Sequence, residues 1–265
     1  CNRRSFFRES YNIEGFGLNR NKSLLIHLER IPLAEEKHFT EVFPNYKIDL
    51  SLRYREARSH QEQLQQESLF KIDNWCSDYE KQIREKGGIG FYLGGIGPDG
   101  HIAFNTRGSD RFSATRLTKT NFETQAVIAA DLGGIEVSRN RLVITIGLGT
   151  LAFNPENKAI VYAAGEAISD VVKNALEEEP GVIYPATSFQ RLKNSRFYLT
   201  EGAAVELKDS IENYYFNSPW THQKTERAVI ELCKKINKFG GKLELKDLKE
   251  DKFCKRIPDL NEHTV

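Results

Sequence analysis

The sequence predicts an α/β fold with a mostly parallel sheet, helices on both faces of that sheet, and a helical C-terminal appendage. Short, continuous apolar runs recur along the chain, and such runs suit strands that are buried on both faces. Between them lie longer stretches in which apolar residues recur at helical spacing. Strands that alternate with helices usually form a parallel sheet, which binds its ligand at the carboxyl ends of the strands.

Five apolar runs are the expected strands. They cover residues 24–28, 88–93, 142–146, 159–164 and 195–200. Because each run is short and bounded by polar or turn-forming residues, we expect strands of ordinary length and not buried helices.

Three stretches with clear bounds are expected helices, and a further helical stretch is expected after the strand at 195–200. Residues 54–86 have apolar side chains every three to five positions and end at Gly87 and Gly88. Residues 166–179 follow an expected strand, and residues 222–239 carry an apolar stripe near the C-terminus. The composition changes near residue 217, which predicts an α/β domain over 1–216 and a helical extension over 217–265. Since the chain starts with Cys1 and contains no methionine, we expect the first domain to lack part of its N-terminal region.

The composition argues against several classes of partner. Hydrophobic residues make up 39% and charged residues 28% of the 265 residues, and the formal net charge is +1. This balance has no basic excess that would favour nucleic-acid binding, and no apolar run approaches the roughly 20 residues of a membrane span. The start of the chain does not resemble a secretory signal, so we expect a cytoplasmic protein. Four scattered cysteines lack metal-ligand spacing, so we expect no metal site.

The stretch 94–105, GGIGPDGHIAFN, is the candidate site. It directly follows the expected strand 88–93, so it lies where a parallel sheet binds its ligand. Its glycines, Gly95, Gly97 and Gly100 among them, allow sharp turns and close approach of the backbone to a ligand. Asp99 and His101 are two residues apart, and a carboxylate can hold an imidazole in one tautomer. His101 is therefore a candidate for proton transfer near neutral pH.

This motif resembles the GxGxDGHIAFN signature of the glucosamine-6-phosphate deaminases, a Rossmann-like α/β family. The related 6-phosphogluconolactonases share GPDGH but continue toward Thr-Ala-Ser. The resemblance extends through Ser109, ATRL at 114–117 and ITIGLGT at 144–150, and it covers roughly residues 24–205.

The resemblance implies a set of catalytic residues. His101 would open the sugar ring, Asp99 would orient His101, and Glu29 would carry a proton between C2 and C1 of the open-chain amino sugar. Loss of ammonia would follow without a metal or another cofactor. The expected substrate-binding residues are Gly95, Gly97, Gly100, Asn105, Thr106 and Arg116.

The chain also departs from the family pattern. Thr106 stands where the family has a glutamate that supports the histidine. Ala129 and Ala130 occupy the region of a phosphate-binding arginine, and Ile168 replaces a phosphate-binding lysine. The sequence therefore leaves three functions open: a deaminase acting in amino-sugar catabolism, a 6-phosphogluconolactonase-like hydrolase, and a non-catalytic sugar-phosphate-binding or structural module.

The expected partner is a small sugar phosphate, with neither nucleic acid nor a membrane involved. The resemblance also makes a homo-oligomer possible, and the C-terminal extension could tether a second domain.

Overall fold

The computed structural model describes residues 24, 26, 31–44, 47–139, 142–238 and 242–258. The chain forms two compact units, Cys1–Asp78 and Tyr79–Val265. Most of the expected strand at 24–28 lies outside the described residues.

The first unit contains short helices and most of one long helix. The short helices are η3 (Ala34–Glu36), α3 (Phe39–Val42) and η5 (Leu50–Arg53), and the long helix is α4 (His60–Glu85). Helix α4 confirms the expected helix at 54–86, but it begins six residues later. The Ser59 hydroxyl accepts a hydrogen bond from the Glu62 backbone at 3.2 Å, and this side chain caps the start of the helix.

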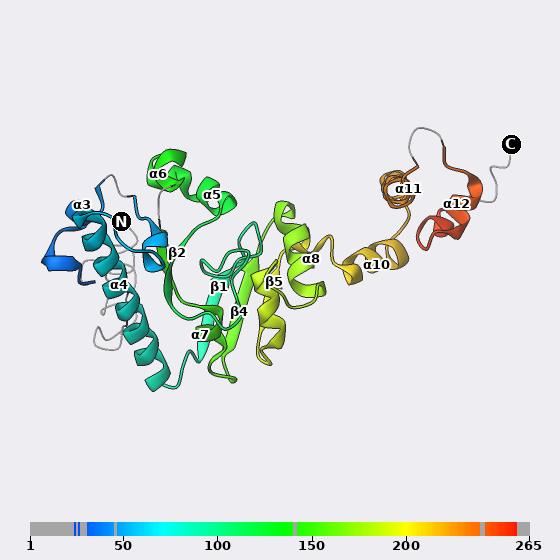
Figure 1. Cartoon of the computed structure of the whole chain (residues 1–265). Coiled ribbons are helices and arrows are strands. Elements are labelled where there is room, and N and C mark those ends of the chain that lie inside the picture. Colours follow the sequence, from blue (N-terminus) through cyan, green and yellow to red (C-terminus); the bar gives the residue numbers. More distant parts are fainter. Residues whose placement is uncertain are drawn as a thin grey trace. The chain divides into compact units, whose positions relative to one another are not determined.

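A three-stranded parallel sheet lies in the second unit. Its strands are β1 (Phe91–Gly95), β4 (Lys158–Ala163) and β5 (Arg196–Leu199), in the order β1-β4-β5 (Figure 1). All three lie within or beside expected strands, because each apolar run can be buried against the helices that follow it. The mixed α/β class is thereby confirmed.

The two faces of this sheet differ in burial. One face carries Tyr92, Val161 and Phe197, and it packs on α7 (Leu148–Ala152), η7 (Pro185–Arg191) and α8 (Ser169–Glu177) to form the main core. Alternate residues point the other way. The large side chains on that other face are 56–60% exposed: Phe91, Leu93, Tyr162 and Tyr198.

The run at 142–146 forms a strand, but its expected place in the parallel sheet is wrong. Strand β3 (Leu142–Thr145) pairs antiparallel with β2 (Arg116–Lys119) in a separate two-stranded sheet. Helices α5 (Phe122–Leu132) and α6 (Ile135–Arg139) connect the two strands. An apolar run predicts a strand without specifying its partner, and β2 is too polar for the sequence pattern to reveal it.

A second core lies toward the C-terminus. After η6 (Glu166–Ile168) and β5, the chain forms α9 (Glu201–Ala204), α10 (Lys208–Asn217), α11 (His222–Ile236), α12 (Leu245–Glu250) and η8 (Cys254–Arg256). Tyr215, Ala228, Leu232 and Cys254 form the buried centre of this core. Because Tyr215 belongs to α10, the second core includes residues before 217. The domain division at 216/217 stays a prediction.

Lys224 is buried in this C-terminal region, with a relative exposure of 1%. Its ammonium group donates to the Ser218 carbonyl at 2.7 Å and lies 4.6 Å from the centre of the Trp220 ring. Among the described helices of the whole chain, none is long and apolar enough to cross a membrane.

Candidate active site

A tight turn follows β1 and shapes the candidate site. The Gly97 backbone N–H donates to the His101 carbonyl at 3.0 Å, and the Gly100 N–H donates to the Gly97 carbonyl at 2.9 Å. Gly100 has a φ of +79°, a conformation that glycine adopts without strain. The turn therefore brings Asp99 and His101 to the carboxyl end of β1, as the sequence predicts.

Asp99 and His101 form a hydrogen-bonded pair. Nδ1 of His101 contacts Oδ1 of Asp99, whose carboxylate is buried. Because a carboxylate only accepts hydrogen bonds, Nδ1 carries the proton of this bond, and Nε2 has no hydrogen-bond partner among the described residues. Gly97 provides room for the ring, because a Cβ at this position would overlap the imidazole.

Two further side chains support the pair. Asn121 donates from Nδ2 to Oδ2 of Asp99 at 2.6 Å, and Oγ1 of Thr124 lies 3.4 Å from Nδ1 of His101. Burial alone would raise the pKa of Asp99, but hydrogen bonding and charge attraction from His101 outweigh it and lower that pKa. The site therefore keeps a carboxylate beside the imidazole.

Asn121 also begins helix α5. Its Oδ1 accepts a hydrogen bond from the Thr124 backbone at 3.1 Å, so one side chain both caps the helix and holds Asp99. Sequence reasoning missed Asn121 and Thr124. The pattern Asn-Phe-Glu-Thr could have indicated a helix start, but nothing in it indicates that the amide meets a carboxylate 22 residues earlier.

Asn105 and Arg116 stabilise the loop after the motif. Asn105 is fully buried, and its amide donates to the carbonyls of Ile102 and Ile146 at 3.0 and 2.9 Å. Arg116 donates to Oδ1 of Asn105 at 2.8 Å and to the Ser109 hydroxyl at 3.0 Å. Burial lowers the pKa of Arg116. Both residues are thus engaged within the protein, and their substrate contacts stay predictions.

The other residues that the sequence predicts for the site differ in where they lie. Gly95 is the last residue of β1, and Thr106 is half-buried, with its carbonyl accepting from the Ser109 N–H at 3.0 Å. Glu29 lies outside the described residues. Within the described ranges, no group of three or more His, Cys, Asp or Glu side chains could hold a metal ion.

Comparison with known proteins gives the family context. Glucosamine-6-phosphate deaminase 2 of Xenopus laevis is 31% identical over 159 residues, which cover 60% of this chain and 57% of that protein. The human glucosamine-6-phosphate deaminase 2 is 32% identical over 157 residues, covering 59% of this chain and 56% of that protein. The Borrelia hermsii glucosamine-6-phosphate deaminase is 34% identical over 151 residues, which cover 56% of this chain and 55% of that protein.

The resemblance to the glucosamine-6-phosphate deaminases is confirmed. The chain spans about half the length of the curated deaminases that it matches. No family model matches the chain.

Solved structures give weaker likenesses. A structure described as a monomeric glucosamine-6-phosphate deaminase has a TM-score of 0.46 and 24% identity, covering 50% of this chain and 54% of that one. The structure of the 6-phosphogluconolactonase from Trypanosoma cruzi has a TM-score of 0.39 and 18% identity, and the match covers 53% of this chain and 54% of that one.

Proposed function

We propose that the chain is a glucosamine-6-phosphate deaminase-like enzyme that converts an amino-sugar phosphate to a ketose phosphate with release of ammonia. The observation that carries the proposal is the Asp99–His101 pair at the carboxyl end of β1. A buried carboxylate fixes one imidazole nitrogen there and leaves the other without a protein partner in the described part of the chain. The similarity to curated deaminases supports the choice of reaction.

His101 would catalyse ring opening. Nε2 can accept the proton of the C1 hydroxyl and return a proton to the ring oxygen, so that the C1–O5 bond breaks and the C1 aldehyde forms. Asp99 stabilises the imidazolium that exists between these two transfers. A His–carboxylate pair of this kind contributes most when its geometry is already formed before the substrate binds.

Glu29 is proposed to move the proton from C2 to C1. Removal of the C2 proton and protonation at C1 converts the amino aldose to a ketose imine. Addition of water at C2 and loss of ammonia then give the ketose phosphate. The net reaction consumes one water and releases one ammonia, and it requires neither a metal nor a redox cofactor.

The glycines and Thr106 are proposed to contact the sugar. Gly97 leaves the room that the His101 ring occupies. All three glycines, Gly95, Gly97 and Gly100, are proposed to let a substrate hydroxyl approach the backbone beside that ring. We assign Asn105 and Arg116 to the same site through their hold on the loop that contains Thr106. The cytoplasmic location and a possible homo-oligomer or tethered second domain belong to the same proposal.

A non-catalytic sugar-phosphate-binding module is the second candidate. Thr106 cannot supply the negative charge that a carboxylate would place near His101, and Arg116 already holds Asn105 and Ser109. The lactonase-like hydrolase has less support, because the residues that follow GPDGH are IAFN at 102–105, whereas the lactonases continue toward Thr-Ala-Ser.

Ammonia release from glucosamine 6-phosphate is the deciding measurement. We expect the full chain to release ammonia and His101→Ala to lose at least about 100-fold of this activity, since removing a general acid-base group typically costs that much. His222→Ala is the matched control, because His222 is an exposed histidine on α11 and its side chain pairs with Glu226 at 3.5 Å. Equal activity in the wild type and His101→Ala, or binding of the sugar phosphate without turnover, would contradict the catalytic proposal.

A further inference from the structure

A pocket of about 240 Å³ lies in the second unit, beside the loop that follows the motif. Three segments and Leu148 line it: residues 109–111, residues 180–182, and Ser188 with Arg191 from η7. The Gly108 N–H donates to the Val182 carbonyl at 2.8 Å, which joins the first two segments at the edge of the pocket.

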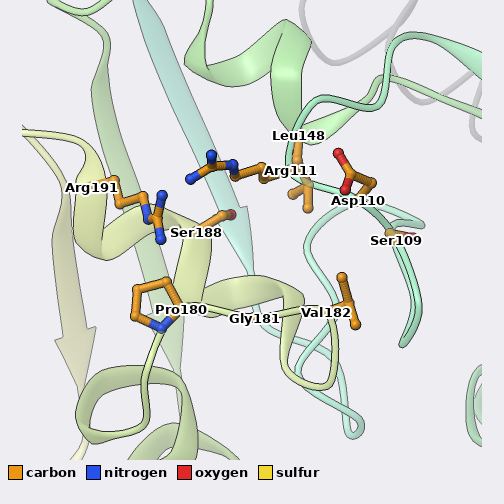
Figure 2. Close-up of a pocket in the computed structure, with 9 residues that line it drawn as sticks. All are labelled: Ser109, Asp110, Arg111, Leu148, Pro180, Gly181, Val182, Ser188 and Arg191. Carbon is orange, nitrogen blue, oxygen red and sulfur yellow. The ribbon is translucent and has the colours of Figure 1, made fainter.

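Arg111 and Arg191 direct their guanidinium groups into the same space (Figure 2). Neither group has an ion pair or a hydrogen bond among the described residues; Arg111 only lies over the Phe112 ring, 4.4 Å from its centre. Both arginines are exposed, and an anion placed between the two guanidinium groups would accept charge-assisted hydrogen bonds from both.

The other polar groups of the pocket fit an anion at the arginine end. Asp110 lies on the side of the pocket away from Arg191 (Figure 2), and its Oδ1 already accepts a hydrogen bond from the Phe112 N–H at 2.7 Å.

The two serines of the pocket already have hydrogen-bond partners within the protein. The Ser109 hydroxyl accepts a hydrogen bond from Arg116. Ser188 lies between the two arginines in the same view, and its hydroxyl donates to the Pro185 carbonyl at 2.7 Å. The binding donors are therefore the two guanidinium groups.

We propose that this pocket binds a phosphate group, either as inorganic phosphate or as the phosphate of a small monoester. Guanidinium forks match phosphate oxygens in geometry as well as in charge, which favours phosphate over a simple halide. The volume lies below the usual range of about 300–1,000 Å³ for pockets that hold drug-sized ligands, so we expect a small ligand. The proposal does not depend on catalysis by His101.

Isothermal titration of the full chain with inorganic phosphate, at constant ionic strength, tests the site. We expect Arg111→Gln and Arg191→Gln each to weaken phosphate binding about tenfold, as loss of a charge-assisted hydrogen bond does, and the double variant to abolish measurable binding. Arg196→Gln is the matched control, because Arg196 is exposed on β5 and lies outside the pocket. Asp110→Asn keeps an acceptor for the Phe112 N–H but removes a negative charge, so it should tighten binding.

A second titration separates the two sources of phosphate. Binding of glucosamine 6-phosphate that needs both arginines, with no binding of glucosamine, would assign the site to a sugar phosphate. Binding of inorganic phosphate alone would assign it to the free ion. Absence of phosphate binding in the wild type, or equal binding by the double variant and Arg196→Gln, would overturn the proposal. These titrations measure binding and require no turnover. Their result can therefore be interpreted even if the chain proves to have no deaminase activity.

Discussion

At the scale of single residues, the candidate site depends on which atom of each side chain is already engaged. Asp99 uses one oxygen for His101 and the other for Asn121, so the carboxylate cannot rotate without breaking a hydrogen bond. Asn121 is in turn fixed at the start of α5 by its bond to the Thr124 backbone. The orientation of the imidazole is thus linked to the first turn of a helix.

Asn121→Ser should separate these two roles. Serine caps helices well, but its hydroxyl is too short to replace the amide that reaches Asp99. We expect kcat for ammonia release to fall roughly tenfold while KM and the thermal midpoint stay near their wild-type values, because the Asn121 amide holds Asp99 and is proposed to act only through this pair. Steady-state kinetics and a thermal melt check this prediction. A change in KM alone would show that Asn121 acts in binding.

Asp99→Asn should change how stability depends on pH. The pKa of Asp99 is lowered from its ordinary value of 3.8 in the folded chain, so the unfolded chain binds its proton first as the solution is acidified. Its contribution to the free energy of unfolding is therefore present above about pH 4 and is lost as pH falls through the folded pKa.

Urea unfolding between pH 7 and pH 2.5 measures this effect. We expect the wild type to be more stable than Asp99→Asn at pH 7 and the difference to shrink below pH 4. A difference that stays constant over the whole range would contradict the lowered pKa.

At the scale of elements, Glu80 joins the end of α4 to two other segments. Its Oε2 accepts hydrogen bonds from the Thr150 hydroxyl of α7 at 2.6 Å and from the Thr115 hydroxyl just before β2 at 2.9 Å. Oε1 pairs with Arg84 at 3.0 Å. Burial acts to raise the pKa of Glu80, but these hydrogen bonds lower it overall. The charged form is therefore the one that the fold stabilises.

Glu80→Ala should lower the free energy of unfolding by about 2–4 kcal/mol, because it leaves the donors at Thr115 and Thr150 without their buried acceptor. Glu85→Ala on the same helix is the control. Glu85 is exposed, its pairing distance to Lys81 is 3.8 Å, and we expect a change below about 0.5 kcal/mol. Chemical denaturation followed by circular dichroism compares the two variants, and similar losses in both would refute the role of Glu80.

The sequence reveals these elements better than it reveals their partners. Strands β1, β4 and β5 follow from short apolar runs, and the Asp99–His101 pair follows from a spacing of two residues in one turn. Glu80, Asn121 and the β2–β3 pairing depend on groups that are distant in sequence, and a polar residue in a helix or before one gives no local sign of what it will meet. Such contacts become visible only when the chain is folded.

At the scale of the whole molecule, two separate hydrophobic cores lie among the described residues of the second unit. One lies under the parallel sheet and includes Leu151, and the other lies in the C-terminal helices and includes Leu232. Both side chains are almost fully buried. Two cores that share few side chains can lose stability independently.

Leu232→Ala and Leu151→Ala should therefore have different consequences. Removing either side chain leaves a cavity that typically costs about 2–5 kcal/mol. We expect Leu232→Ala to melt the C-terminal core early with phosphate binding retained, and Leu151→Ala to weaken phosphate binding because α7 borders the pocket.

Trp220 fluorescence in a Trp75→Phe background reports on the C-terminal core, and titration reports on the pocket. If the two variants lose both signals together, the cores are one cooperative unit.

The buried ammonium of Lys224 gives the C-terminal helices a chemical reporter of their own. Reagents that acylate amines need a neutral and accessible nitrogen. Burial lowers the pKa of Lys224, which favours the neutral amine, but it also keeps the reagent away from the nitrogen. Exposed lysines such as Lys246 would be acylated at the ordinary rate of the reagent, whereas Lys224 would react only when α11 separates from its neighbours. The rate at which label appears on Lys224, measured by mass spectrometry, therefore reports how readily the C-terminal core opens.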